Sequence, residues 1–228
     1  MIVETVDIIR DLVASLQLKV VVDSVADNMD GTYTVTTKCT RHIQSGMSFS
    51  VSGVDYVVIS FERDVSFTVL GASTISVSSF LLPAPKFWHG SILETNKTLT
   101  GIADMSEKVP MVYLRRPYKD NFNRDDSAIE RDSDVTLYFL CEDNFQQYDI
   151  DDRDKECIYP MRSLLYSFVE MLKNNSQIGI IDSFDVENKE RFGVVNSKGV
   201  EKALFDTPLS GCELNIIIPI KKNYQCKC

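Results

Sequence analysis

The chain has 228 residues, of which 44% are apolar, 10% aromatic and 25% charged, so its composition is typical of a globular protein with a packed core. Its 33 acidic residues outnumber 24 Lys and Arg residues, which gives a formal charge of −9 at pH 7. That balance argues against general nucleic-acid binding, which needs clustered basic side chains facing phosphate. The sequence shows no secretory signal and no apolar run of about 18 residues, so we expect a protein made in the cytoplasm without membrane association.

The first segment predicts an amphipathic helix over residues 3–16. Val6, Ile9 and Val13 recur at helical spacing, and charged residues occupy most of the other positions. A helix with one apolar face needs a surface to cover. We therefore expect residues 1–17 to pack on the second module of the chain.

From residue 18 to residue 82 the apolar period changes to two. Tyr33 and Val35 alternate with threonines, and Phe49 and Val51 alternate with serines. Glycines between these runs indicate hairpin turns. Five or six short strands about ten residues apart predict a small all-β domain, a sandwich or a barrel, at residues 18–82.

Pro83 and Pro85 interrupt this pattern, because neither residue can donate a hydrogen bond to a strand ladder. We place a domain boundary here. The residues that follow have little periodicity and contain the only tryptophan, Trp88, next to His89. We expect an extended arm at residues 83–108.

The remaining residues, to 228, predict an antiparallel sheet backed by helices. The strongest helix signal is residues 159–172, where Pro160 suits a first helical turn and apolar residues form one stripe. Alternating or short apolar runs predict strands at residues 109–114, 135–141, 178–181, 192–195 and 212–220. The expected fold class is therefore α+β, with a small β-sandwich or barrel inserted in or appended to the helix-backed sheet.

The sequence lacks four short motifs by which many enzymes are identified. They are the nucleophile elbow, the phosphate loop, the dinucleotide-binding fingerprint and the zinc-binding helix. The two histidines, His42 and His89, are too few for a multi-histidine metal site. The six cysteines show no C-x-x-C spacing, and Cys226 and Cys228 fit a frayed terminus better than a metal site. We therefore expect no enzyme activity, no cofactor and no metal.

Acidity is concentrated in residues 120–156, which hold thirteen acids and four bases; 4 − 13 = −9, the charge of the whole chain. Closely spaced carboxylates there suggest a calcium loop, but the glycine and the distal bidentate glutamate of such loops are missing. We favour solvated acidic loops. The aspartates that we expect on this acidic surface are Asp149, Asp151, Asp152 and Asp154.

One ordered series of short segments covers about residues 83–220. Its members are Phe87-Trp88-His89-Gly90, Val109 to Leu114, Glu130 to Asp134 leading into Leu137 to Leu140, Tyr159-Pro160-Met161, Phe192-Gly193-Val194, and Leu209 to Glu213. The series resembles structural neck and tail proteins of tailed bacteriophages of the crAss-like type. The expected domain arrangement is also similar to that of tail terminators and head-to-tail connectors.

The resemblance implies a virion structural protein of the phage neck or tail. It implies a ring of six or twelve copies around the DNA channel, in contact with the portal and with adjoining neck or tail proteins, through which DNA passes without sequence-specific binding. Candidate interface residues are Trp88, His89, Arg115 and Arg116. The acidic aspartates would line the channel, where they repel phosphate over about 8 Å, or would face a basic patch on a neighbour.

Two other functions stay open at this point. A carbohydrate- or host-surface-binding module of a phage tail is suggested by the Thr- and Ser-rich strands, with Tyr33 and Trp88 as possible stacking groups. A carboxylate-dependent hydrolase is the third hypothesis, for which the sequence supplies acids but no recognisable catalytic pair.

Overall fold

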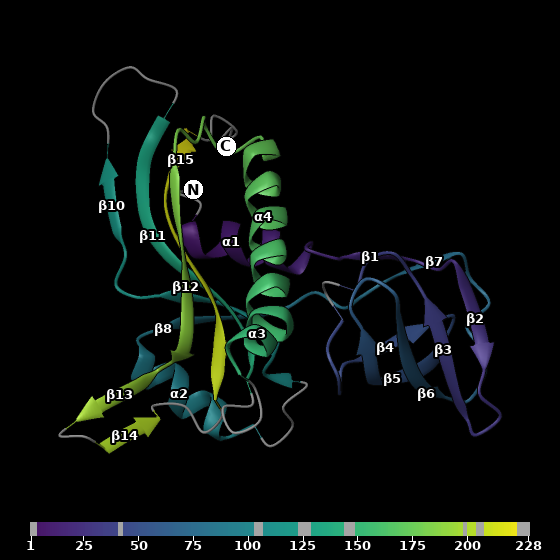
Figure 1. Cartoon of the computed structure of the whole chain (residues 1–228). Coiled ribbons are helices and arrows are strands. Elements are labelled where there is room, and N and C mark those ends of the chain that lie inside the picture. The colour runs from purple at the N-terminus through teal and green to yellow at the C-terminus, as the bar shows by residue number, and fades with distance from the viewer. Residues whose placement is uncertain are drawn as a thin grey trace. The chain divides into compact units, whose positions relative to one another are not determined.

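The computed structural model divides the chain into two compact units, Gln17–Ala84 and Met1–Leu16 with Pro85–Cys228 (Figure 1). The sequence places the corresponding boundaries after residues 17 and 82. The α+β fold class is confirmed. The structure describes residues 4–40, 43–102, 107–122, 129–143, 149–197, 200–203 and 208–222. His42, Cys226 and Cys228 lie outside these residues.

The unit Gln17–Ala84, called here the β unit, consists of strands and connecting turns. Its strands are β1 (Lys19–Val21), β2 (Ser24–Asp27), β3 (Thr32–Thr36), β4 (Ser48–Val51), β5 (Val54–Glu62), β6 (Ser66–Gly71) and β7 (Ser79–Leu81). Five of them form an antiparallel sheet in the order β2-β3-β6-β5-β4, and β1 pairs with β7. Ser52 and Gly53 both have positive φ, 53° and 81°, as a two-residue hairpin turn between β4 and β5 requires.

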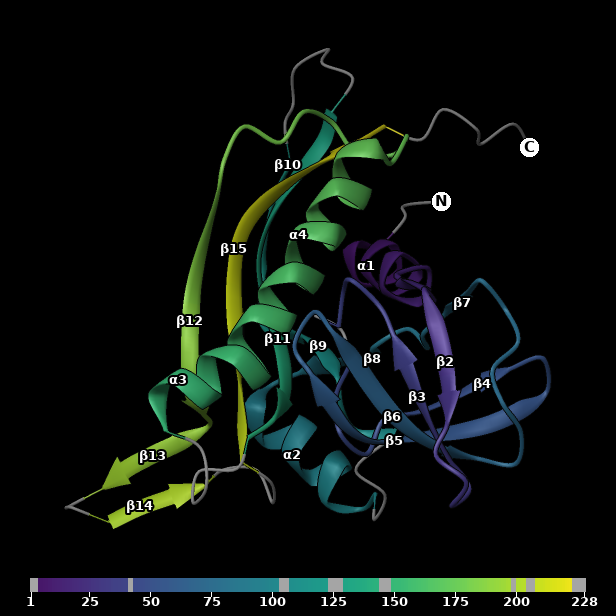
Figure 2. The ribbon, with the colours of Figure 1, turned by 45° about the vertical axis from the view of Figure 1, so that its right-hand side comes forward.

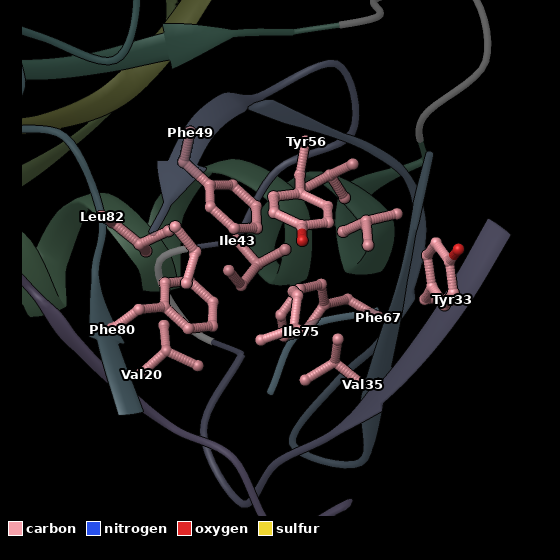
Figure 3. Packing of buried hydrophobic residues seen from close by; sticks show 13 residues of the cluster. Val20, Tyr33, Val35, Ile43, Phe49, Tyr56, Phe67, Ile75, Phe80 and Leu82 are labelled. Carbon is pink, nitrogen blue, oxygen red and sulfur yellow. The ribbon is translucent and has the colours of Figure 1, made fainter. Parts of the chain in front are cut away.

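Aromatic side chains fill the core of the β unit (Figure 3). Phe49 stacks on Phe80 with ring centroids 4.8 Å apart, and Phe67 meets each of them edge-on at 6.4 Å. Phe80 belongs to β7, whereas the other two rings come from the five-stranded sheet. The small β1–β7 sheet thus covers one face of the larger sheet, which corresponds to the sandwich form of the predicted all-β domain.

The second unit, called here the α+β unit, is built around a six-stranded sheet. The order is β12-β15-β11-β9-β8, and β10 pairs with the first half of β11. The pair β8–β9 is parallel and the other pairs are antiparallel, so the sheet is mixed rather than purely antiparallel. The elements are α1 (Thr5–Ala14), β8 (Lys86–Gly90), α2 (Ile92–Thr100), β9 (Met111–Arg115), β10 (Lys119–Phe122), β11 (Ile129–Glu142), α3 (Ile150–Arg153), a π-helical turn (Asp154–Ile158), α4 (Tyr159–Asn174), β12 (Phe184–Phe192), β13 (Val194–Ser197), β14 (Val200–Ala203) and β15 (Leu209–Lys221).

Helices cover the two faces of this sheet unequally (Figure 2). On one face α4 packs across β11 and β15, where the rings of Phe139 and Phe168 lie 5.6 Å apart, and α1 contacts α4 and β8. On the opposite face Leu99 of α2 packs with Met111, Tyr113 and other residues at one end of the sheet. The amphipathic N-terminal helix and the alternating C-terminal strand that the sequence predicts are confirmed as α1 and β15.

The expected extended arm at residues 83–108 is wrong, because β8 and α2 occupy most of it. A capping box begins α2: the Ser91 N–H donates to Glu94 Oε2 at 3.0 Å, and the Glu94 N–H donates to Ser91 Oγ at 3.3 Å. The helix buries only Thr95 and Leu99. So small an apolar face gives almost no helical periodicity in the sequence.

The strands predicted at residues 178–181 and 192–195 are also wrong. Residues 178–181 form no strand: Ile178 makes an isolated bridge to Ile220, and regular pairing starts only at β12. The strand expected at residues 192–195 is divided between β12 and β13. Gly193, with φ of 75°, turns the chain between them.

Candidate functional site

The four candidate interface residues lie around the β8 edge of the sheet, but on two different faces. His89 and Arg116 are exposed on the side of α1. Trp88 is half-buried on the α2 side, where its Nε1–H donates to the Lys108 carbonyl at 3.4 Å, and Arg115 lies beside the Tyr138 hydroxyl. Because successive residues of a strand alternate in direction, neighbours in the sequence cannot act on one face together. The structure therefore places His89 and Arg116 on one face, and Trp88 and Arg115 on the other.

On the α1 side, aromatic and basic groups form one surface, called here the β8 patch. The Arg10 guanidinium lies 5.8 Å from the centre of the Phe87 ring, and the rings of Phe87 and His89 are also 5.8 Å apart. Arg116 lies 5.9 Å from the ring of Tyr118. These distances are typical of cation–π and aromatic contacts. Arg10 also forms an ion pair with Asp7 at 2.6 Å, so the net positive charge of the patch comes from Arg116.

The surroundings of His89 favour its neutral form. Partial burial lowers the pKa of its imidazole below 6.5, and the positive charges of Arg116 and Arg10 lower it further, against a small opposite effect of Asp7. The imidazole therefore adds an aromatic surface and hydrogen-bonding nitrogens rather than a third positive charge.

The four aspartates expected on an acidic loop lie at the start of a helix instead. Asp149 is the N-cap of α3, since its Oδ1 accepts from the Asp152 N–H at 2.8 Å. Asp151 and Asp152 follow, exposed, in the first turn, and half-buried Asp154 begins the π-helical turn. The prediction of acidic loops over residues 120–156 is wrong here, and β10 and β11 fill other parts of that range. Carboxylates are favoured in a first helical turn because they accept from its free N–H groups and oppose the helix dipole.

The long helix predicted from residue 159 is confirmed as α4, with Pro160 in its first turn, but α3 and the π-helical turn directly precede it, so helical structure already begins at Ile150. Proline has no N–H for the carbonyl four residues before it, and its ring crowds that carbonyl. The π-helical turn directly before α4 changes the hydrogen-bonding pattern at this point. The acidic segment and the long helix are thus continuous.

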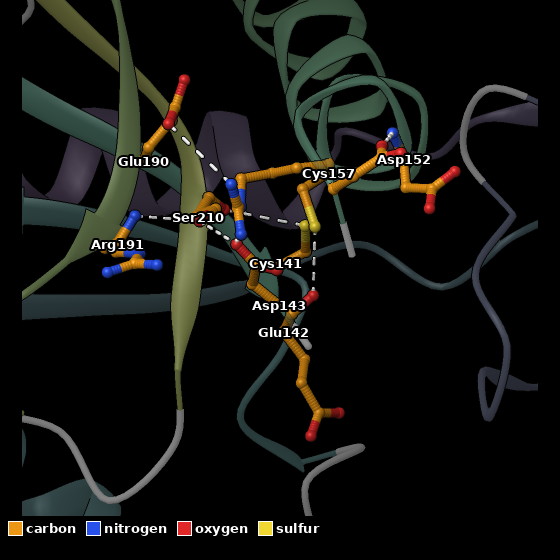
Figure 4. A network of polar contacts seen from close by, with 10 residues as sticks. Cys141, Glu142, Asp143, Asp152, Cys157, Glu190, Arg191 and Ser210 are labelled. Carbon is orange, nitrogen blue, oxygen red and sulfur yellow. Dashed lines mark hydrogen bonds and ion pairs between the residues drawn. The ribbon is translucent and has the colours of Figure 1, made fainter. Parts of the chain in front are cut away.

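Arg153 lies among these aspartates in the sequence, but it is buried, whereas Asp151 and Asp152 are exposed. Figure 4 shows the polar groups at this place, with Asp143, Glu190, Arg191 and Ser210 among the labelled residues. The Arg153 Nε donates to Asp143 Oδ2 at 2.6 Å, and the Ser210 hydroxyl donates to the same oxygen. Ser210 Oγ in turn accepts from the Arg191 N–H at 3.1 Å. This network, called here the Arg153 network, connects α3 with β15, with β12 and with the residue that follows β11. Nothing in the local sequence distinguishes Asp143 and Arg153 from solvated charges.

A second buried arginine, Arg131, has only 1% of its surface exposed. Its Nε lies 3.6 Å from Asp120 Oδ2, and its Nη2 donates to Thr5 Oγ1 at 3.4 Å. The hydroxyls of Thr5 and Ser133 lie 2.8 Å apart in the same place. This cluster, called here the Arg131 cluster, connects the start of α1 to β10 and β11.

The face of the sheet opposite α4 carries an acidic hollow of about 450 Å³ beside β12. Four carboxylates line it, together with apolar side chains, of which Ile180 is 85% and Ile217 is 55% exposed. The four are Asp132, Asp134, Asp182 and Asp185. Sequence reasoning missed this surface. Part of it could have been predicted, because Asp132 and Asp134 are two residues apart in one strand and therefore share one face of the sheet.

The cysteine and metal chemistry of the described residues is limited. Burial raises the pKa of the Cys212 thiol to about 11, so the thiol is protonated and unreactive at neutral pH. Among the described residues no three His, Cys, Asp or Glu side chains gather in a way that could hold a metal ion. No helix in this part of the chain is long and apolar enough to cross a membrane.

No family model, no curated protein and no solved structure matches this chain. A functional proposal for this chain therefore rests on its surfaces and edge strands and on the resemblance of residues 83–220 to phage neck and tail proteins.

Proposed function

We propose that the chain is a structural subunit of the neck or tail of a tailed bacteriophage, which assembles with copies of itself into a ring around the DNA channel. One observation carries the proposal: the sheet of the α+β unit ends in two edge strands, β12 and β8, whose surroundings have opposite charge. Two different surfaces that suit each other give head-to-tail contacts, and a rotation that closes turns such contacts into a ring.

The charge difference between the two edges comes from few residues. Beside β12, Asp182, Asp185 and Glu187 are exposed. Lys189 offsets part of this charge, because its Nζ lies 2.8 Å from Glu187 and 3.0 Å from Glu213, and Asp182 and Asp185 remain as exposed acids. At the other edge the exposed bases are Lys86 and Arg115, together with Arg116 of the β8 patch.

The acidic hollow supports the same role. A channel wall has to let DNA pass without binding it, and carboxylates repel phosphate over a Debye length of about 8 Å at physiological salt. In the proposed ring the open sheet face with Asp132 and Asp134 is the acidic surface available for the channel. The aspartates of α3 form a second exposed acidic group.

The structure gives little support to a carbohydrate-binding module. Tyr33, one of its two suggested stacking groups, is 9% exposed and belongs to the core of the β unit. Trp88, the other, packs against the α2-side core and donates its N–H to a backbone carbonyl. An aromatic ring needs a free face to stack on a sugar, and neither ring is fully exposed.

The proposal is tested by the assembly state of the purified chain and by its presence in particles. We expect native mass spectrometry and negatively stained class averages to show rings of six or twelve copies, and proteomics of purified virions to find the chain. A chain that stays monomeric at high concentration and is absent from particles would contradict the proposal.

A further inference from the structure

We propose that β12 of one copy pairs with β8 of a second copy, so that the sheet of the α+β unit continues from subunit to subunit. The partner is a second copy of this chain, and the inference rests on the proposed function, for which it supplies the contact surface. Four properties of the two edges carry it: their strand directions, the outward backbone groups of β8, their side-chain faces and their charges.

The strand directions permit the pairing. Along the sheet, β12 and β11 run opposite to β15, β9 runs opposite to β11, and β8 is parallel to β9. It follows that β12 and β8 run in opposite directions at the two ends. When a second copy extends the sheet with its helices on the same side, its β12 meets β8 antiparallel, which is the more stable arrangement.

The backbone of β8 has hydrogen-bonding groups directed outward. The Lys86 N–H donates to the Pro110 carbonyl at 2.9 Å, and the Gly90 carbonyl accepts from the Arg116 N–H at 2.8 Å, so these residues bond toward β9. Because backbone groups alternate along a strand, those of Phe87 and His89 point away from β9. Among the described strands none pairs with that outer edge, nor with the outer edge of β12. Open edges of this kind are templates for another strand.

The side chains match face by face in this arrangement. On the helix-covered face, Phe87 and His89 of β8 would lie beside Phe184 and Val186 of the partner copy's β12, all of them aromatic or apolar. Phe184 and Val186 share that face with Asn188, whose side chain accepts from Arg162 of α4. Phe87, Phe184 and Val186 are half-buried and His89 is exposed, so an extended sheet would cover aromatic and apolar groups at each edge.

On the opposite face the match is electrostatic. Lys86 points to the same side as Trp88. On β12 the corresponding side carries Asp185, Glu187 and Lys189. Lys189 Nζ lies 2.8 Å from Glu187 and 3.0 Å from Glu213, so Asp185 is the carboxylate of this row without an ion pair to Lys189. Lysine opposite carboxylates is a favourable cross-strand pair, whereas like charges at the same position are destabilising. Contact between two β8 edges or two β12 edges would place like charges together, so the charges favour the head-to-tail contact.

A charge-swap experiment tests this contact. Variant A carries Lys86→Glu, and variant B carries Asp185→Lys and Glu187→Lys. Each variant alone places like charges at every β8–β12 contact, and we expect about a tenfold rise in the dissociation constant of the assembly, since charge reversal at an interface changes binding by roughly 1–2 kcal/mol. Sedimentation velocity or native mass spectrometry measures it.

Mixing the two variants provides the decisive result. In an equimolar mixture the carboxylate introduced into β8 of variant A faces the lysines introduced into β12 of variant B, and the other contacts are native, so we expect rings in which A and B alternate. Lys38→Glu, an exposed reversal in the β unit, is the matched control and should assemble like the wild type. Circular dichroism of each variant checks that it is folded.

The outcomes separate this inference from the proposed function. Wild-type rings together with unchanged assembly of A and B alone, or with no recovery in the mixture, would refute β8–β12 pairing and leave the ring subunit standing. A wild-type chain that forms no assembly would contradict both. Weak assembly of A and of B, with recovery on mixing, would support the pairing.

Discussion

The two units of the chain bury different kinds of side chain. Among the described residues, the polar groups buried in the β unit are two threonines, Thr37 and Thr40, and its core is otherwise apolar and aromatic. The α+β unit buries Arg131, Asp143 and Arg153 as well as a large apolar core. The core of the β unit is thus apolar, whereas the core of the α+β unit also contains charges that require specific partners.

This difference predicts different responses to mutation. An apolar core accepts replacements that keep its volume and loses stability mainly when a cavity forms. A buried ion pair adds little net stability, because desolvation of both charges offsets their attraction, but removal of one partner leaves the other charge uncompensated. The four changes below test these expectations in order of decreasing effect.

Phe67→Ala should have the largest effect. Phe67 is fully buried and meets Phe49 and Phe80, so its removal should lower the free energy of unfolding of the β unit by about 4 kcal/mol. A unit of this size has roughly 3–10 kcal/mol in total, so it should be largely unfolded. Amide hydrogen exchange within residues 17–84 measures the loss. Val57→Ala, at a side chain 40% exposed, is the control, and equal effects of the two would contradict an aromatic core.

Asp143→Ala tests the Arg153 network. Removal of the carboxylate leaves the Arg153 guanidinium buried without its closest acceptor, and we expect a loss of about 3 kcal/mol in the α+β unit by urea denaturation. Asp151→Ala, at an exposed aspartate of the same segment, should change stability by less than about 0.5 kcal/mol. Similar values for the two aspartates would mean that the Arg153 network is not a buried ion pair.

Cys212 makes the stability of the α+β unit depend on alkaline pH. Burial raises the pKa of its thiol from 9.0 to about 11, so the unfolded chain loses this proton first as pH rises. The protonated Cys212 thiol stabilises the folded state by on the order of 2 kcal/mol. This stabilisation is fully present below pH 9 and is lost as pH rises to about 11. Cys212→Ala should flatten this part of the curve of unfolding free energy against pH. An unchanged slope between pH 9 and pH 11 would exclude Cys212 as its source.

Ser91→Ala should have the smallest effect. It removes the side-chain half of the capping box of α2, and we expect a loss of about 1 kcal/mol by urea denaturation. Thr98→Ala on the exposed side of the same helix is the control, because alanine is the better helix former. If both variants were equally stable, the cap would not determine where α2 begins.

The sequence was sufficient for features with a strong local period. The stripe of α1, the alternation in β15 and the turn at Gly53 each depend on residues within one element, and each is confirmed. β8 and α2 were missed because their form depends on distant residues or on a cap. β8 is a strand through its pairing with β9, twenty-five residues further along the chain.

The candidate site was harder to predict than the fold, because it consists of edges and faces. The sequence drew attention to Trp88 and His89, yet no local pattern shows that they lie on opposite faces of an edge strand. Arg153 and Asp143 look like solvated charges until the helix and the sheet are placed against each other. The acidic hollow likewise joins Asp132 to Asp182, fifty residues apart, through the register of β11, β15 and β12.

The pairing of β1 with β7 has a consequence for how the chain folds. These strands are the first and last of the β unit, and the Leu82 N–H donates to the Leu18 carbonyl at 2.9 Å, so the two ends of that unit lie side by side. Until the β unit folds, α1 is separated from β8 by a loop of 68 residues, Gln17–Ala84. Once it has folded, the effective loop is only a few residues long, which lowers the entropic cost of docking α1 by about 2–3 kcal/mol. The folded β unit thereby holds the end of α1 close to the start of β8. If the β unit folds first, α1 should dock on the rest of the α+β unit faster.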